Sequence, residues 1–356
     1  MIPILSLRRL SLTLLFPFVF LRLGAESAVD PALAAFADEK FARFAEAEAA
    51  LAAADAAGEA AARQALDQAS VLTGPNGWLF TLNDLRHHAA GKFWGEAAAD
   101  AAVSARHPDP LPAIAGFAAQ AREAGVRLIL LPVPSKIALY PEELHADLAG
   151  WEDPFRPAFL AALREAGVEV LDIAPALQAL KAEGIHAHVP GDTHWSPAAV
   201  EKAADLLLAQ LGEDRPVADD AATVVFTDQE RQVRGDLAAR VGGERDVLRY
   251  RRVTLNGEPA RSDAGSPVVL MGDSHGLVFG HADLLTTGAG LGDHLAGRLG
   301  FPLDVIAAMG SGANASRITL ARRGDNLSGK EVLIWVFAER EWSRSTSGWP
   351  PVPVVR

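Results

Sequence analysis

Three side chains in this sequence have the types and setting needed for nucleophilic chemistry, and the first of them is Ser274. It follows the apolar run 268–271, which has the length of a buried strand. Such a strand delivers the next residues to the carboxyl edge of a parallel sheet, where open α/β folds place their sites. Gly272 and Gly276 permit a sharp turn that exposes the hydroxyl and directs backbone N–H groups at an anion. Because a serine hydroxyl is a weak nucleophile, it needs a base.

Asp192 and His194 supply that base and a carboxylate to orient it. Imidazole titrates near neutral pH and can relay a proton between a serine and a leaving group. Residues two apart in extended backbone point the same way, so the Asp192 carboxylate can fix the tautomer of the His194 ring. We therefore predict a catalytic triad with Ser274 as nucleophile, His194 as base and Asp192 as the orienting group.

Neither motif is specific alone, because Gly-Asp-Ser is also an ordinary turn sequence. A metal site is a real alternative, since nitrogen and oxygen ligands of zinc cluster within nine residues, at His186, His188, Asp192 and His194. The pattern offers no helix to fix the ligand spacing and no identifiable distal ligand. The sequence therefore favours serine chemistry without a metal and leaves the zinc alternative open.

An oxyanion hole would complete a serine site, and the Ser274 N–H is its first expected donor. Gly310, Gly312 and the Asn314 side chain follow another apolar run and are further candidates. An equally good interpretation is a strand-to-helix turn with Asn314 as the helix N-cap.

Substrate-binding candidates are Lys136, Arg340 and Trp195. Both cations follow apolar runs, so we expect them at the same sheet edge, where they could bind an acidic sugar or the acyl donor. Trp195 could stack on a sugar, although core packing is the commoner role of tryptophan. An arginine-rich segment could attract a polyanionic glycan, but acidic residues interleave with its arginines. These arginines are Arg231, Arg234, Arg240, Arg245, Arg249, Arg251 and Arg252.

From about residue 110, apolar runs of strand length alternate with helical patterns. The predicted strands cover 126–133, 168–173, 267–271, 303–308 and 332–337, and the predicted helices cover 111–124, 157–166, 197–211, 292–299 and 314–323. Strands buried on both faces and alternating with helices indicate an α/β fold with a mostly parallel central sheet. Residues 212–262 are polar, and their order is only weakly predicted.

Composition narrows the class of protein. The 356 residues are 49% hydrophobic and 22% charged, which excludes whole-chain disorder. The absence of cysteine excludes disulfides, thiolate metal sites and a cysteine nucleophile. A formal charge of −12 argues against nucleic acid as the main partner.

Four segments follow from these patterns. Residues 1–27 have two arginines, an apolar run and then small residues, as in a signal peptide, although Arg22 leaves an uncleaved N-terminal anchor open. Residues 28–70 are Ala-rich and helical, interrupted only by Gly58. We expect the catalytic domain over 71–342 and an extended tail over 343–356.

Several motifs, in their order along the chain, resemble the AlgX/AlgJ-type SGNH-hydrolase-like proteins, which are bacterial polysaccharide O-acetyltransferases known best from alginate acetylation. The resemblance spans roughly 71–342 and is closer to the AlgJ type, because no C-terminal carbohydrate-binding module follows. The matching segments are Gly77-Trp78-Leu79-Phe80, Pro132-Val133-Pro134-Ser135-Lys136 with Tyr140-Pro141, Asp192-Thr193-His194-Trp195, Arg234-Gly235-Asp236-Leu237, Gly272-Asp273-Ser274, and Ile334-Trp335 through Glu339-Arg340.

The resemblance implies a three-layer SGNH-hydrolase-like fold and supports the same triad. It further implies transfer of acetyl through an acyl-serine onto hydroxyls of an exported polysaccharide. The expected setting is the periplasm, with the protein soluble or anchored to the inner membrane by its N-terminus. A membrane-bound O-acyltransferase would bring the acetyl group, and no cofactor is expected. An exported carbohydrate acetyl-esterase with the same triad and a non-catalytic glycan-binding subunit of an export complex remain alternatives.

Overall fold

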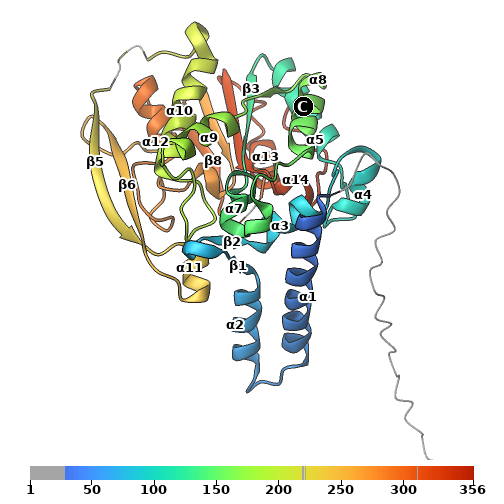
Figure 1. Ribbon diagram of the computed structural model, residues 1–356. Coiled ribbons are helices and arrows are strands. Elements are labelled where there is room, and N and C mark those ends of the chain that lie inside the picture. Colours follow the sequence, from blue (N-terminus) through green and yellow to red (C-terminus); the bar gives the residue numbers. More distant parts are fainter. Residues whose placement is uncertain (1–28, 219, 221, 311) are drawn as a thin grey trace, which may run out of the picture.

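The computed structural model describes residues 29–218, 220, 222–310 and 312–356, so the expected signal segment at 1–27 lies outside the described residues. Its centre is a five-stranded parallel sheet with the order β4-β3-β9-β7-β8 (Figure 1). The strands are β3 (Arg127–Val133), β4 (Glu169–Val170), β7 (Val268–Gly272), β8 (Asp304–Ala307) and β9 (Val332–Ala338). The predicted mostly parallel α/β fold is confirmed, and the carboxyl ends of the strands meet at one edge.

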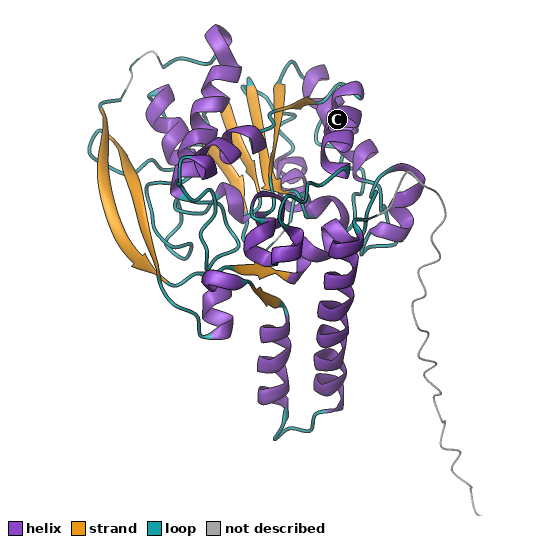
Figure 2. Cartoon of the chain, in the orientation of Figure 1, coloured by secondary structure: helices purple, strands orange, loops and turns teal. Residues whose placement is uncertain are grey.

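Helices cover both faces of this sheet (Figure 2). Successive residues of β3 alternate between the two cores: Ile129 and Leu131 face one, and Leu128 and Leu130 face the other. This two-sided burial explains why the strands are continuous apolar runs rather than alternating ones. On the first face lie α9 (Ala174–Ala182), α10 (Pro197–Leu211) and α12 (Leu291–Leu299), and on the second lie α5 (Pro110–Glu123), α8 (Phe155–Glu165) and α13 (Asn314–Arg323).

Helix α10 shows how local sequence sets the boundaries. The Ser196 side chain accepts a hydrogen bond from the Ala199 N–H at 3.2 Å, and Pro197 occupies the first helical position. Both residues favour the start of a helix at this point. The proline has no N–H that would need a partner, and the serine accepts a hydrogen bond from one of the otherwise unpaired N–H groups of the first turn. The predicted span 197–211 is therefore confirmed to the residue.

The N-terminal Ala-rich segment forms two helices, α1 (Pro31–Ala53) and α2 (Glu59–Ala69), rather than one interrupted helix. They lie side by side and project from the sheet domain (Figure 1). Only Leu33 and Ala37 of α1 are buried. In the described part of the chain, no helix has both the length and the apolar character that crossing a membrane requires.

The weakly predicted segment 212–262 contains a long antiparallel pair, β5 (Val224–Val233) and β6 (Asp246–Leu255), joined through α11 (Asp236–Val241). Strand β5 is exposed along most of its length, so it lacks the apolar alternation that reveals a strand in a sequence. This pair lies beside α10 and α12 and away from the parallel sheet.

Shorter elements complete the domain. A second small pair of strands precedes α3, and a one-turn helix, η5, carries Ser274. The elements are β1 (Val71–Thr73), η1 (Pro75–Gly77), β2 (Leu79–Thr81), α3 (Leu82–Ala89), η2 (Gly95–Ala97), α4 (Ala98–Ala101), α6 (Lys136–Leu139), α7 (Pro141–Leu144), η3 (Ala146–Leu148), η4 (Gly212–Asp214), η5 (Ser274–Gly276) and α14 (Glu341–Arg344).

The C-terminal tail has no regular structure after α14, but it is packed. Trp349 and Val354 are each 2% exposed and belong to the core under α5. The Gln120 side chain accepts hydrogen bonds from the Val354 and Val355 N–H groups, which ties the tail to this helix. The tail therefore forms part of the domain.

Candidate active site

Ser274 lies where β7 ends, at the edge shared by the strands. A β-carbon at Gly272 would overlap the Val336 carbonyl oxygen, so only glycine allows this close approach to β9. The preceding Asp273 fixes the turn, because its carboxylate accepts hydrogen bonds from the His275 N–H at 2.8 Å and the Ala338 N–H at 3.0 Å. Ser274 itself remains partly exposed. The chain thus presents the hydroxyl on a rigid turn.

The three predicted triad residues come together. The His194 Nε2 lies 2.8 Å from the Ser274 Oγ, and the His194 Nδ1 lies 2.6 Å from the Asp192 Oδ1. Because an ionised carboxylate can only accept, Nδ1 carries a hydrogen and Nε2 is free to accept the serine proton. The arrangement is that of a Ser–His–Asp proton relay.

A residue of the β5–β6 segment holds the triad aspartate. The Asp236 N–H donates to the second carboxylate oxygen of Asp192 at 2.8 Å. The Asp236 carboxylate in turn accepts from the Thr193 N–H and hydroxyl, each at 2.8 Å. A β-carbon at Gly235 would overlap the Gly191 carbonyl oxygen, so the close approach of these two loops requires glycine there. This segment, distant in the sequence, therefore holds the Asp192–His194 loop in place.

The charges around His194 suit its role as a base. Burial acts to lower the pKa of His194, but the hydrogen bond and charge of Asp192 outweigh it, so the pKa is raised above its usual value. Burial acts to raise the pKa of Asp192, but its hydrogen bond to His194 and the His194 charge lower it. Asp192 therefore stays ionised and stabilises the imidazolium that forms when His194 takes a proton.

A zinc site would use the four candidate ligands, but only two of them lie together in the structure. Among the described residues, Asp192 and His194 cluster with Asp236, whereas the His186 ring packs 5.1 Å from the Trp78 ring. All four carboxylate oxygens of Asp192 and Asp236 accept hydrogen bonds from donors of the chain. A cation would have to displace these donors, so the residues fit a proton relay better than a metal site.

Lys136 takes a different place from the one expected of a substrate-binding cation. It is 2% exposed, and its Nζ donates to the carbonyl oxygens of Leu79, Val189 and Pro190 at 2.9, 2.7 and 3.1 Å. A fourth bond reaches the Asp192 carbonyl. These contacts commit the ammonium to the backbone around the Asp192 loop, which corrects the expectation that it contacts substrate.

Trp195 is also placed differently, whereas Arg340 stays near the site. Trp195 is fully buried, and its indole N–H donates to the His275 carbonyl at 3.2 Å, so its ring packs in the core and cannot stack on a sugar. The Arg340 side chain is 17% exposed and lies 3.3 Å from the Asp84 carboxylate. Burial acts to lower the pKa of Arg340, but the carboxylates of Asp84, Glu341 and Asp273 raise it, so the cation persists.

Of the oxyanion candidates, some lie near Ser274 and one is committed to other partners. Within the described residues, the Ser274 N–H donates to no acceptor. Gly310 and Gly312 follow β8, whose end lies beside that of β7, and both have positive φ. The Asn314 amide instead donates to Ser345 Oγ, Ser347 Oγ and the Gly348 carbonyl oxygen. Asn314 is therefore neither an oxyanion donor nor an N-cap, since Ala313 takes the cap position.

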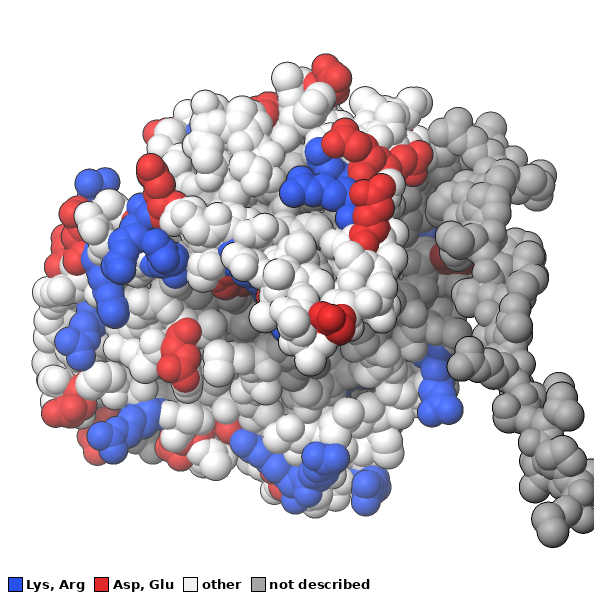
Figure 3. Space-filling model, turned by 90° about the horizontal axis from the view of Figure 1, so that it is seen from below, with Lys and Arg blue, Asp and Glu red and all other residues white. Residues whose placement is uncertain are grey.

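The arginines of the β5–β6 segment do not form a purely basic patch. Arg249 pairs with Glu230 at 2.9 Å, and Arg251 pairs with Glu201 of α10. Figure 3 shows basic and acidic side chains interspersed over one face of the molecule. This placement argues against a simple electrostatic surface for a polyanion.

Two residues of the site were missed by reasoning from the sequence. Asp236 had no assigned role, although the motif that contains it lies between the two halves of the triad. Asp273 directly precedes the nucleophile, but aspartate is also an ordinary turn residue. Its hydrogen bond to β9 could not be read from a sequence, because it joins residues 65 positions apart.

The family model described as "SGNH hydrolase-like domain, acetyltransferase AlgX" matches residues 71–339. The chain belongs to this family. The AlgX family match covers all three triad positions as well as the parallel sheet.

Two curated relatives carry the name "Probable alginate O-acetylase AlgJ". The protein from Pseudomonas aeruginosa is 30% identical over 169 residues, which is 47% of this chain and 40% of the relative. The protein from Pseudomonas syringae pv. tomato is 30% identical over 155 residues, or 41% of this chain and 34% of the relative. The matched regions thus span well under half the length of these relatives.

Two solved structures share the fold. The O-acetyltransferase domain of Pseudomonas putida AlgJ has a TM-score of 0.59 at 23% identity, covering 77% of this chain and 92% of that one. Pseudomonas aeruginosa AlgX has a TM-score of 0.55 at 18% identity, covering 75% and 61%. At these identities the likeness establishes the architecture alone.

Proposed function

We propose that this AlgX-family protein transfers an acetyl group, through an acetyl-Ser274 intermediate, onto hydroxyls of an exported bacterial polysaccharide. The observation that carries the proposal is the continuous hydrogen-bonded line from the Ser274 Oγ through His194 to Asp192, at 2.8 and 2.6 Å. A non-catalytic glycan-binding subunit would have no need for this alignment.

The chemistry has two halves. In the first, the Ser274 Oγ attacks the donor's acetyl carbonyl while His194 Nε2 takes the hydroxyl proton, and the proton then passes to the departing donor oxygen. In the second, His194 Nε2 takes a proton from a sugar hydroxyl, whose oxygen attacks acetyl-Ser274. Ser274 regains its proton, and the sugar ester leaves. Asp192 stabilises the imidazolium in both halves.

Negative charge develops on the acetyl oxygen in each half and needs hydrogen-bond donors. The Ser274 N–H is the first donor that we propose, with the N–H of Gly310 as the second. One such donor contributes about 10²–10³ in rate. The partly exposed Arg340 lies at the same sheet edge and is proposed to contact the donor or the acceptor.

An acetyl-esterase is the second candidate, because the partly exposed Ser274 also admits water to the acyl-serine. We propose the transferase on the strength of the family to which the chain belongs. On the same ground we propose a periplasmic location, a membrane-bound O-acyltransferase that brings acetyl across the membrane, and a reaction that requires no cofactor.

Replacing Ser274 tests the proposal. In Ser274→Ala the nucleophile is lost, so release of acetate from a chromogenic acetate ester should fall by at least about 10³-fold. With an oligosaccharide present, the unaltered protein should produce acetylated sugar, detected by mass spectrometry. Unchanged turnover in the variant would exclude the triad, and acetate release without any sugar ester would favour the esterase.

A further inference from the structure

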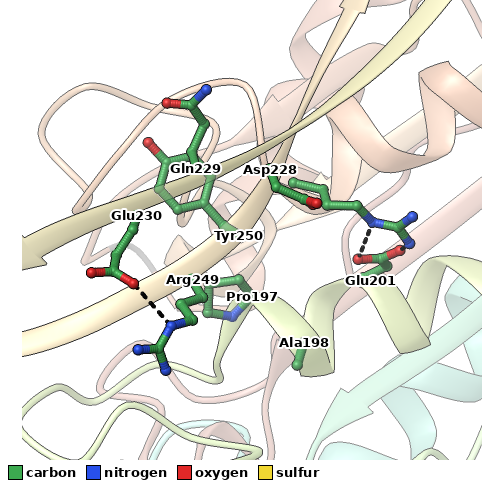
Figure 4. Close-up of a pocket in the computed structure, with 9 residues that line it drawn as sticks. Pro197, Ala198, Glu201, Asp228, Gln229, Glu230, Arg249 and Tyr250 are labelled. Atoms are coloured by element: carbon green, nitrogen blue, oxygen red, sulfur yellow. Dashed lines mark hydrogen bonds and ion pairs between the residues drawn. The ribbon is translucent and has the colours of Figure 1, made fainter.

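A groove of about 560 Å³ with charged residues in its walls lies between the start of α10 and the β5–β6 pair (Figure 4). On the α10 side it is lined by Pro197, Ala198 and Glu201, and on the strand side by residues 228–230 and 249–251. Two ion pairs bound it: Glu230 with Arg249 and Glu201 with Arg251.

The groove exists because one face of the β5–β6 pair changes character along its length. At one end Phe226 lies opposite Val253, and both pack on Gly297 of α12. Further along the same face, Asp228 lies opposite Arg251 and Glu230 opposite Arg249. Side chains two apart share a face of a strand, so the apolar half seats the pair on α12 and the charged half faces α10. Because these charged side chains do not pack as closely as a hydrophobic core, a groove is left between the strands and α10.

A short length of chain joins the wall of this groove to the triad loop. Pro197, in its wall, is three residues after His194, a length of chain that spans at most about 10 Å. The opposite wall leads through β5 to Asp236, whose N–H holds the Asp192 carboxylate. A chain molecule lying in the groove would therefore extend toward the imidazole that must take the acceptor's proton.

We propose that the groove binds the acceptor as an uncharged glycan chain, an inference that rests on the proposed transferase activity. Its charged lining consists of three carboxylates, on Glu201, Asp228 and Glu230, against the guanidinium groups of Arg249 and Arg251. Such groups hydrogen-bond sugar hydroxyls, whereas an excess of carboxylates repels a uronate polymer. The formal charge of −12 on the whole chain acts in the same direction.

The acceptor preference of the unaltered protein tests whether the acceptor is an uncharged glycan. Hexasaccharides of neutral hexose (glucan, mannan and galactan) and of mannuronate are compared as acceptors in steady-state transfer. At least one neutral hexamer should be accepted with a lower KM than the mannuronate chain, and its KM should change less than about twofold between low and high salt. Rejection of every neutral hexamer, or a mannuronate KM that is lower and rises with salt, would overturn the proposal.

Reversing one charge in the groove tests whether the acceptor binds there. Asp228→Lys removes an acceptor for sugar hydroxyls and reverses a charge, so the KM for the preferred neutral hexamer should rise about tenfold, more than kcat falls. The matched control is Glu165→Lys, an exposed position on α8 beyond the opposite face of the sheet, which should leave both constants unchanged. If the two variants behave alike, the groove does not bind the acceptor. Ser274-dependent ester hydrolysis is measured separately, so a failure of the groove and a failure of the triad are distinguishable.

Discussion

At the scale of single residues, the proposed reaction depends on the protonation of His194. Its neutral form must accept the Ser274 proton, so activity requires a pH above its pKa. Burial lowers that pKa, but Asp192 outweighs it and the net direction is upward. We therefore expect kcat/KM for an acetate ester to rise with pH through a pKa above the usual value of about 6.5.

The Asp192→Asn variant checks the cause of that shift. Without the carboxylate, burial is left to lower the pKa of His194, so the rising limb should move to lower pH. The rate should also fall by about 10³–10⁴-fold, because the amide does not hold the required tautomer. An unmoved limb in the pH–rate profile would show that Asp192 does not set the pKa.

A serine at the end of a predicted strand, together with an Asp–His pair two residues apart, was enough to nominate the triad, because the conjunction is more specific than either motif alone. The roles of Lys136, Trp195 and Asn314 could not be predicted in the same way. A lysine after a strand has the same sequence signature whether it reaches solvent or, as here, donates to the Leu79 and Val189 carbonyls. Only the fold supplies those distant partners.

At the scale of elements, the Asp192–His194 loop has almost no regular structure and is held from outside. Lys136, at the start of α6, donates to carbonyl groups on that loop and on β2. Asp236, at the start of α11, bonds the neighbouring residues Asp192 and Thr193 of the loop. The strand and helix periods that predict elements carry no information about such cross-connections, so the contribution of residues 212–262 to the site could not be predicted.

Replacing Lys136 tests this bracing. Lys136→Met keeps the apolar stem but leaves buried carbonyls without their donor, at about 1–3 kcal/mol for each group. We expect the free energy of unfolding in urea to fall by about 3 kcal/mol or more, and kcat to fall with it. Lys202→Met, at an exposed position of α10, is the control and should change neither. A variant with full stability and only a raised KM would mean that Lys136 contacts substrate after all.

At the scale of the whole molecule, the sheet brings together chemistry from distant parts of the chain because all five strands are parallel and end at one edge. The prediction of five buried strands was therefore sufficient to place Ser274. The packing of the tail was not predictable, because three prolines and no periodicity give the same pattern whether the segment is free or seated on a core.

The tail offers a test of that packing. The Trp349 ring lies 5.8 Å from Phe337 and 6.1 Å from Trp335, on strand β9. Trp349→Ala should lower the free energy of unfolding by about 3–5 kcal/mol, because it leaves a cavity against the sheet. Val217→Ala, at a side chain that is 76% exposed, should change it by less than about 0.5 kcal/mol. Equal stabilities of the two variants would show that the tail is not part of the core.

The most direct test of the central claim is to capture the acyl-enzyme. The protein is mixed with an activated acetate ester, quenched in acid within milliseconds, digested and analysed by mass spectrometry. The account predicts that the peptide containing Ser274 gains the mass of one acetyl group, and that Ser274→Ala shows neither this adduct nor turnover. An acetyl group on a different residue, or continued turnover by the variant, would contradict it.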